Sequence, residues 1–102
     1  MPTLHTINKS PFDRNSLQTC LRLANKGAAV ILIEDGVYGA MKGNTVSATV
    51  EKALSDLSIY VLGPDMKARG VDESKIIDGI KVVDYKGFVD LTVENDKINA
   101  WL

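Results

Sequence analysis

An unbroken apolar run at residues 28–33 (AAVILI) constrains the fold of this chain more than any other feature. Successive side chains of a strand point to opposite faces, so a strand of this composition is apolar on both sides. Such a strand fits the middle of a parallel sheet that is covered by helices on both faces. The run ends sharply at Glu34-Asp35-Gly36, which predicts a turn at the carboxyl end of the strand.

The rest of the chain alternates between strand-like and helix-like patterns, which requires crossover connections between parallel strands. We expect strands at residues 4–7, 28–33, 59–62 and 80–83, helices at 45–57 and 85–95, and a helical turn at 65–69. The chain then closes on residues 98–102, to which no element is assigned. We therefore predict one α/β domain over residues 1–102, a three-layer sandwich whose mainly parallel sheet has helices on both faces.

A further helix is expected before the apolar run. Its apolar residues follow helical spacing: Leu17, Cys20, Leu21 and Ala24. The helix stops at Asn25-Lys26-Gly27, and Ser10-Pro11, Asp13 and Asn15 are alternative starts.

The composition excludes several classes of function. The 102 residues carry 12 Lys+Arg and 13 Asp+Glu, a formal net charge of −1, which leaves no basic footprint for direct binding of nucleic acid or of an anionic membrane. One cysteine makes neither an internal disulfide nor a cysteine-based zinc site, and no run approaches the ~18 apolar residues of a membrane span. With no signal-peptide pattern at the N-terminus, we expect a cytoplasmic protein whose low charge permits association with other subunits.

The glycine motifs that bind dinucleotides or phosphates are absent, and we expect no cofactor and no metal. Open parallel sheets form their sites at the carboxyl ends of strands, here residues 8–10, 34–36, 63–65 and 84–85. Glu34 and Asp35 have the chemistry of an acid–base pair or of a divalent-cation site. Because neighbours on a strand diverge, we favour a polar strand end.

Four other residues have both a functional and a structural interpretation. His5, the only histidine, has the pKa range of a proton carrier, but its position within a strand favours a hydrogen-bonded structural role. Lys67 and Arg69 either bind an anion or an acidic partner or lie in a solvated loop, which we favour. Trp101 gains much from burial, so we expect it to dock on its own domain or to anchor an interface.

Cys20 is the only soft nucleophile in the chain. Thiol chemistry requires an accessible thiolate, whereas a free cysteine in a helix is often a small core residue. At ~100° per residue, Cys20 falls at the edge of the apolar face of its helix, and Leu23 lies further round the same side. An edge position with an extra leucine indicates a subunit contact as much as a reactive site, and both interpretations stay open.

Several short segments occur in a characteristic order and spacing across about 100 residues: LHT (4–6), SP (10–11), CLRL (20–23), IEDGV (33–37), Ala68-Arg69-Gly70, DY (84–85), FVDLT (88–92) and Trp101. Each segment alone is weak, but together they resemble the DsrH/TusB family of sulfur-relay subunits. Cys20 and the Glu-Asp-Gly-Val run are more similar to the DsrH branch of sulfur-oxidising bacteria than to the tRNA-thiolating TusB branch.

The resemblance implies the DsrE-like α/β fold and a place as the smallest subunit of a cytoplasmic heterohexamer, with DsrE-like and DsrF-like subunits as partners. That complex accepts sulfur as a cysteine persulfide and passes it to a DsrC/TusE-type acceptor. The principal sulfur-carrying cysteine of the family lies on the DsrE/TusD subunit, and residues 63–66, after the third strand here, contain no cysteine. Cys20 matches the cysteine of DsrH-type chains and is the candidate sulfur-carrying catalytic thiol.

Four functions follow from these observations. The first is a subunit of a DsrEFH-like sulfurtransferase in sulfur oxidation, which we adopt, with the main catalytic cysteine expected on the DsrE-like partner. The alternatives are a non-catalytic structural subunit of that complex and a TusB-like subunit in the synthesis of 2-thiouridine in tRNA. A free-standing ligand-binding domain that uses the carboxyl ends of the strands is the fourth, and it rests on fold analogy alone.

Overall fold

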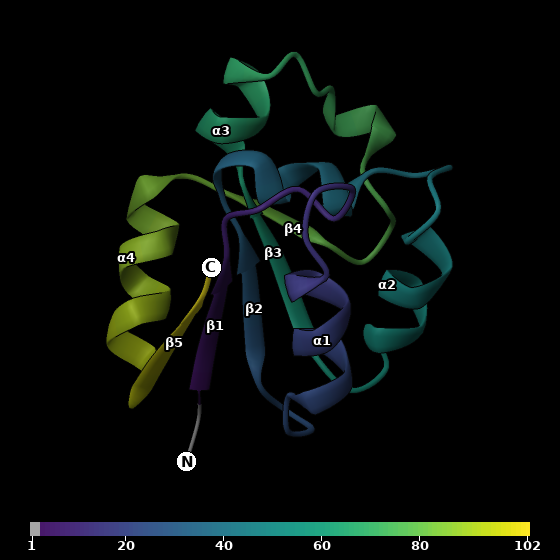
Figure 1. Ribbon diagram of the computed structural model, residues 1–102. Coiled ribbons are helices and arrows are strands. Elements are labelled where there is room, and N and C mark those ends of the chain that lie inside the picture. The colour runs from purple at the N-terminus through teal and green to yellow at the C-terminus, as the bar shows by residue number, and fades with distance from the viewer. Residues whose placement is uncertain (1–2) are drawn as a thin grey trace.

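Five strands form one sheet in the order β4-β3-β2-β1-β5, and each of their pairings is parallel (Figure 1). The computed structural model describes residues 3–102. The strands are β1 (Thr3–Ile7), β2 (Ala29–Leu32), β3 (Ser58–Leu62), β4 (Lys81–Val83) and β5 (Lys97–Trp101). All four residues of β2 are buried in the middle position, as the apolar run predicts.

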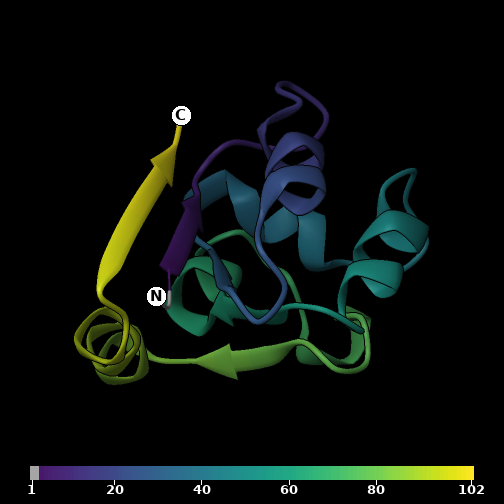
Figure 2. The ribbon, with the colours of Figure 1, turned by 90° about the horizontal axis from the view of Figure 1, so that it is seen from below.

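Helices cover both faces of the sheet, which confirms the predicted three-layer α/β fold. Helices α1 (Ser16–Leu23) and α2 (Ser47–Ala53) lie on one face and α4 (Tyr85–Glu94) on the other (Figure 2). Three short elements lie near the carboxyl ends of the strands: the 3-10 helices η1 (Glu34–Ala40) and η2 (Glu73–Lys75), and α3 (Gly63–Ala68) (Figure 1). Within residues 3–102, no helix is both long and apolar enough to cross a membrane.

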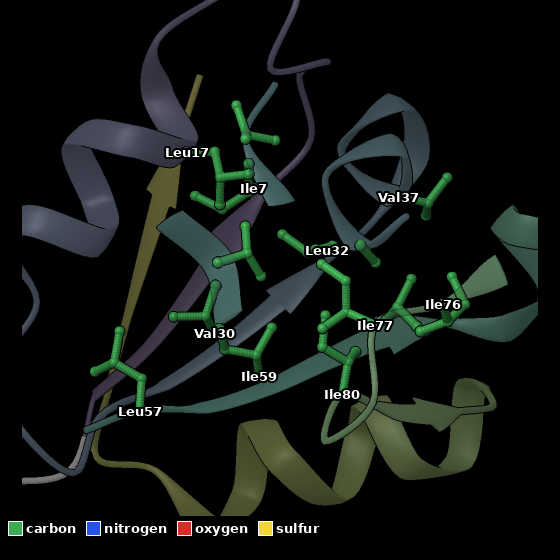
Figure 3. Close-up of a cluster of buried hydrophobic side chains, with 14 of the residues drawn as sticks. Ile7, Leu17, Val30, Leu32, Val37, Leu57, Ile59, Ile76, Ile77 and Ile80 are labelled. Carbon is green, nitrogen blue, oxygen red and sulfur yellow. The ribbon is translucent and has the colours of Figure 1, made fainter. Parts of the chain in front are cut away.

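Two apolar clusters hold the layers together. The larger one lies between the sheet and α1, α2 and η1, and includes Ile7, Leu17, Val30, Leu32 and Val37 (Figure 3). The smaller one lies under α4 and comprises Leu4, Ala29, Ile31 and Leu91. Successive side chains of β2 alternate between the two clusters. Val30 and Leu32 belong to the larger cluster, and Ala29 and Ile31 belong to the smaller one.

Gly36 explains the turn that follows β2. The amide of Ile33 donates to the carbonyl oxygen of Ile7 at 2.9 Å, which draws this turn onto the end of β1. A Cβ atom at Gly36 would overlap the same carbonyl oxygen, so the close approach of the two chain segments requires glycine here.

The structure also corrects several predicted boundaries. The helix before β2 begins at Ser16 with Asn15 as its N-cap, while the Ser10 hydroxyl accepts a hydrogen bond from the amide of Phe12 in a turn. The second helix is shorter than residues 45–57, and α3 begins two residues before the expected turn. Strand β5 and η1 were not predicted; β5 occupies the sheet edge beside β1, with Trp101 opposite Ile7.

Candidate functional site

Cys20, the predicted sulfur-carrying thiol, lies inside the larger core cluster. Its side chain is 0% exposed and packs in the same cluster as Leu17 and Val50. The expected edge position is wrong because α1 packs against α2 as well as the sheet, and this closes the side on which Cys20 lies. The side chain therefore has the surroundings of a core residue.

Burial also sets the chemistry of this thiol. Removal from water disfavours the thiolate and raises the pKa of Cys20 to about 12. Attack on a persulfide needs the thiolate and a path for the sulfur donor, and the folded chain offers little of either. The geometry thus favours packing over sulfur transfer for Cys20.

The carboxyl edge of the sheet brings the predicted segments 34–36 and 63–65 together. The backbone amide of Glu34 donates to the Asp65 carboxylate at 2.6 Å. Arg69 Nε donates to Asp35 Oδ1 at 2.8 Å, and this hydrogen bond raises the pKa of the Arg69 guanidinium. The solvated loop expected for Arg69 is therefore wrong, because the side chain joins α3 to the turn after β2.

Glu34 and Asp35 do not form an acid–base pair in this arrangement. Asp35 is engaged by Arg69, and Glu34 contributes its backbone amide, with a left-handed φ of 49°. No group of three or more His, Cys, Asp or Glu side chains suited to a metal ion occurs among residues 3–102. The edge is a polar strand end held by side-chain contacts, as favoured from the sequence.

His5 and Trp101 join the first and last strands. Trp101 Nε1 donates to His5 Nδ1 at 3.0 Å, with the ring centroids 6.2 Å apart. His5 is buried, and burial lowers its pKa. Since Nδ1 accepts a hydrogen bond, the neutral ring carries its proton on Nε2. The structural role predicted for His5 is confirmed, and Trp101 docks on its own domain.

Helix α4 carries an exposed apolar surface, which is not among the predicted site residues. This α4 stripe comprises Tyr85, Val89 and Val93, which are 61%, 58% and 78% exposed. The spacing of four residues places them along one side of the helix, away from buried Leu91. The sequence carries a signal for this stripe, because the apolar residues of 85–94 cover a wider arc of the helix than one contact with the sheet can bury.

Comparisons with known proteins add independent information. Residues 9–98 match the family model described as DsrH like protein. Curated relatives include Protein TusB of Pectobacterium parmentieri, 39% identical over 99 residues, and Protein TusB of Escherichia coli K12, 35% identical over 98 residues. Each alignment covers 96% of this chain and 99% of the relative.

Solved structures share the fold at low sequence identity. The ychN protein from Escherichia coli superposes with a TM-score of 0.80 at 19% identity, covering 99% of this chain and 100% of that one. Protein MTH1491 from Methanobacterium thermoautotrophicum gives a TM-score of 0.74 at 17% identity, covering 96% and 97% of the two chains. These likenesses concern the fold, whereas the full-length matches in sequence concern the family. The chain belongs to the DsrH/TusB family.

Proposed function

We propose that this chain is the small subunit of a cytoplasmic sulfur-relay complex and that it contributes assembly surface rather than the sulfur-carrying thiol. The observation that carries this proposal is a contrast within one chain: its single cysteine is fully buried, whereas the α4 stripe lies in water. Membership of the DsrH/TusB family supports the sulfur-relay context.

The chemistry of the proposed complex is persulfide transfer. The thiolate of a DsrC/TusE-type acceptor attacks the outer sulfur of a cysteine persulfide, the S–S bond breaks, and the donor cysteine leaves as a thiolate. The donor belongs to a DsrE-like subunit in this proposal, because residues 63–66 of the present chain contain no cysteine. The sulfur-carrying role of Cys20 remains the sequence-based alternative.

The α4 stripe is the proposed contact with a DsrE-like or DsrF-like subunit of a heterohexamer. Contiguous apolar side chains on a small protein mark interaction sites, because covering them removes apolar surface from water. The formal net charge of −1 adds little repulsion to such an association.

Co-expression with DsrE-like and DsrF-like chains tests this proposal. We expect the three chains to purify together and a Val89→Lys/Val93→Lys variant to lose at least about tenfold in affinity for its partners, because two ammonium groups would enter an apolar contact. Glu94→Lys is the matched control: it adds the same two units of charge on the same helix outside the stripe. A wild-type chain that stays monomeric beside its homologues would overturn the proposal, as would equal behaviour of the two variants.

Two pathways are compatible with a sulfur-relay subunit. Cys20 and residues 34–37 resemble the DsrH branch and favour sulfur oxidation, whereas 35–39% identity to TusB proteins favours tRNA thiolation. Deletion of the gene in the organism that encodes it distinguishes them. Loss of 2-thiouridine from hydrolysed tRNA, measured by mass spectrometry, would support the second pathway, and unchanged 2-thiouridine with impaired sulfur oxidation would support the first.

A further inference from the structure

A cavity of about 850 Å³ opens at the amino-terminal edge of the sheet, opposite the edge that holds Asp35 and Arg69. Its walls come from the first residues of β1 and β5 and from the loop between α1 and β2. Figure 2 shows β5 and α1 on either side of β1. The volume lies within the range of ~300–1,000 Å³ typical of small-molecule sites.

The charged residues of this cavity share one sign. Lys26 lies on the loop after α1 and Lys97 at the start of β5, and none of the described residues that line the cavity is Asp or Glu. Neither lysine forms an ion pair within the part of the chain that the structure describes. Two walls thus carry a lysine that has no ion-pair partner among residues 3–102, which favours a ligand with negative charge.

Neutral hydrogen-bond donors supplement the two lysines. His5 is among the lining residues, and its neutral ring carries the proton on Nε2 because Nδ1 accepts the Trp101 hydrogen bond. Asn25 and Asn99 also line the cavity, and neither side chain is hydrogen-bonded to another residue in the range 3–102. Ammonium, imidazole and amide donors around one space are the groups that proteins use to bind phosphate and carboxylate oxygens.

The remaining wall is apolar. Leu23 and Ile98 are 59% and 54% exposed, and both line the cavity together with Ala24 and Ala28. An inorganic ion would leave these side chains in water, whereas an organic ligand would cover them. The cavity therefore combines an apolar wall with a cationic, donor-rich one.

We propose that this cavity binds a small organic anion, with a phosphate or carboxylate group at Lys26 and Lys97 and an apolar body against Leu23 and Ile98. The inference rests on the cavity alone and does not depend on the sulfur-relay assignment. Its ligand would bind at the opposite edge of the sheet from the site expected for α/β domains of this kind.

Nuclear magnetic resonance of the ¹⁵N-labelled full chain at low salt tests the proposal. The probes are phenyl phosphate and phthalate, with benzyl alcohol as the uncharged match, inorganic phosphate as the ion without an apolar body, and hexaglutamate as the protein-segment source. We expect phenyl phosphate or phthalate to shift the amides of Gly27, Lys97 and Asn99 saturably, and benzyl alcohol and hexaglutamate to leave them in place. Inorganic phosphate should bind more weakly than phenyl phosphate.

A pair of charge variants makes the test specific. Lys26→Gln/Lys97→Gln should weaken binding of the organic anions at least about tenfold, because each lysine contributes a charge-assisted contact. Lys52→Gln/Lys67→Gln removes the same charge from surfaces outside the cavity and should leave the affinity unchanged. The proposal fails if neither organic anion gives a saturable shift, if both variants bind equally, or if hexaglutamate binds more tightly than the small probes.

Discussion

If Cys20 is a core residue, its thiol in the folded chain reacts very slowly with iodoacetamide. The pKa of about 12, against an ordinary value of 9.0, lowers the thiolate fraction at pH 8 from roughly one in ten to roughly one in ten thousand. The difference corresponds to about 4 kcal/mol between the two protonation states. The side chain is also 0% exposed, so the reagent reaches it only when the chain opens.

Iodoacetamide can label Cys20 either within the folded chain or after unfolding, and each route limits the rate of labelling. Reaction within the folded chain is slowed about a thousandfold by the scarcity of thiolate alone. Reaction through unfolding is slowed by a factor of roughly several thousand if the chain has the ~5 kcal/mol stability at the low end for small domains. We therefore expect Cys20 to react at least about a thousandfold more slowly in the folded chain than in the unfolded chain.

Intact-mass spectrometry over time at pH 8, with and without guanidinium, measures this ratio. The control is a Cys20→Ala/Leu23→Cys chain, which moves the only thiol to a position that is 59% exposed on the same helix. Its thiol should react within about tenfold of the unfolded rate, because it needs no opening of the fold. A Cys20 rate in the folded wild-type chain that equals the control rate would refute the packing argument and restore the sulfur-carrying role.

Three further predictions concern substitutions at Cys20, His5 and Gly36. Cys20→Ala should lower the free energy of unfolding by about 1–2 kcal/mol and leave sulfur transfer by the assembled complex intact. Cys20→Ser should cost more, because it buries an unpaired hydroxyl. Loss of sulfur transfer in the alanine variant would contradict the packing role. Because burial lowers the pKa of His5, its neutral form contributes stability that is present above pH ~6.5 and lost as the pH falls through the lowered value. Denaturant melts from pH 7 to 5 should show a steeper loss in wild type than in His5→Asn, and parallel curves would exclude the effect. Gly36→Ala should lower the free energy of unfolding by about 1–3 kcal/mol or more, because its Cβ would overlap the Ile7 carbonyl oxygen. The control Gly43→Ala should cost about 1–2 kcal/mol, because only its φ of 77° is unfavourable. Equal melting temperatures of the two variants would contradict the overlap.

The sequence predicts an element well when its composition allows only one position in the fold. A strand that is apolar on both faces can lie only between two layers, and β2 does so. The predicted helix at 85–95 likewise covers the other face, where Leu91 is buried and Phe88 packs against the same cluster. Strand β5 is not predicted although residues 97–100 alternate between polar and apolar types, because its strand state depends on pairing with β1, more than 90 residues earlier in the chain.

The candidate site depends more strongly on contacts between distant residues. Helical spacing gives the direction of Cys20 on its own helix, but its exposure is set by α2, whose position the spacing does not contain. The Arg69–Asp35 pair joins residues 34 positions apart, and it requires α3 to lie over the end of β2. Neither fact follows from local sequence, which explains why Cys20 was placed at an edge and Arg69 in a solvated loop.

The carboxyl edge of the sheet in this chain suits a fixed surface better than a sulfur carrier. A sulfur carrier must present its thiolate first to a donor and then to an acceptor, which needs an exposed cysteine on a segment that can move. At the carboxyl edge, where the family resemblance places that cysteine, this chain instead holds α3 against the turn after β2 through Asp65 and Arg69. In the assembly that we propose, an edge fixed in this way and without a thiol would supply a constant surface to the neighbouring subunits.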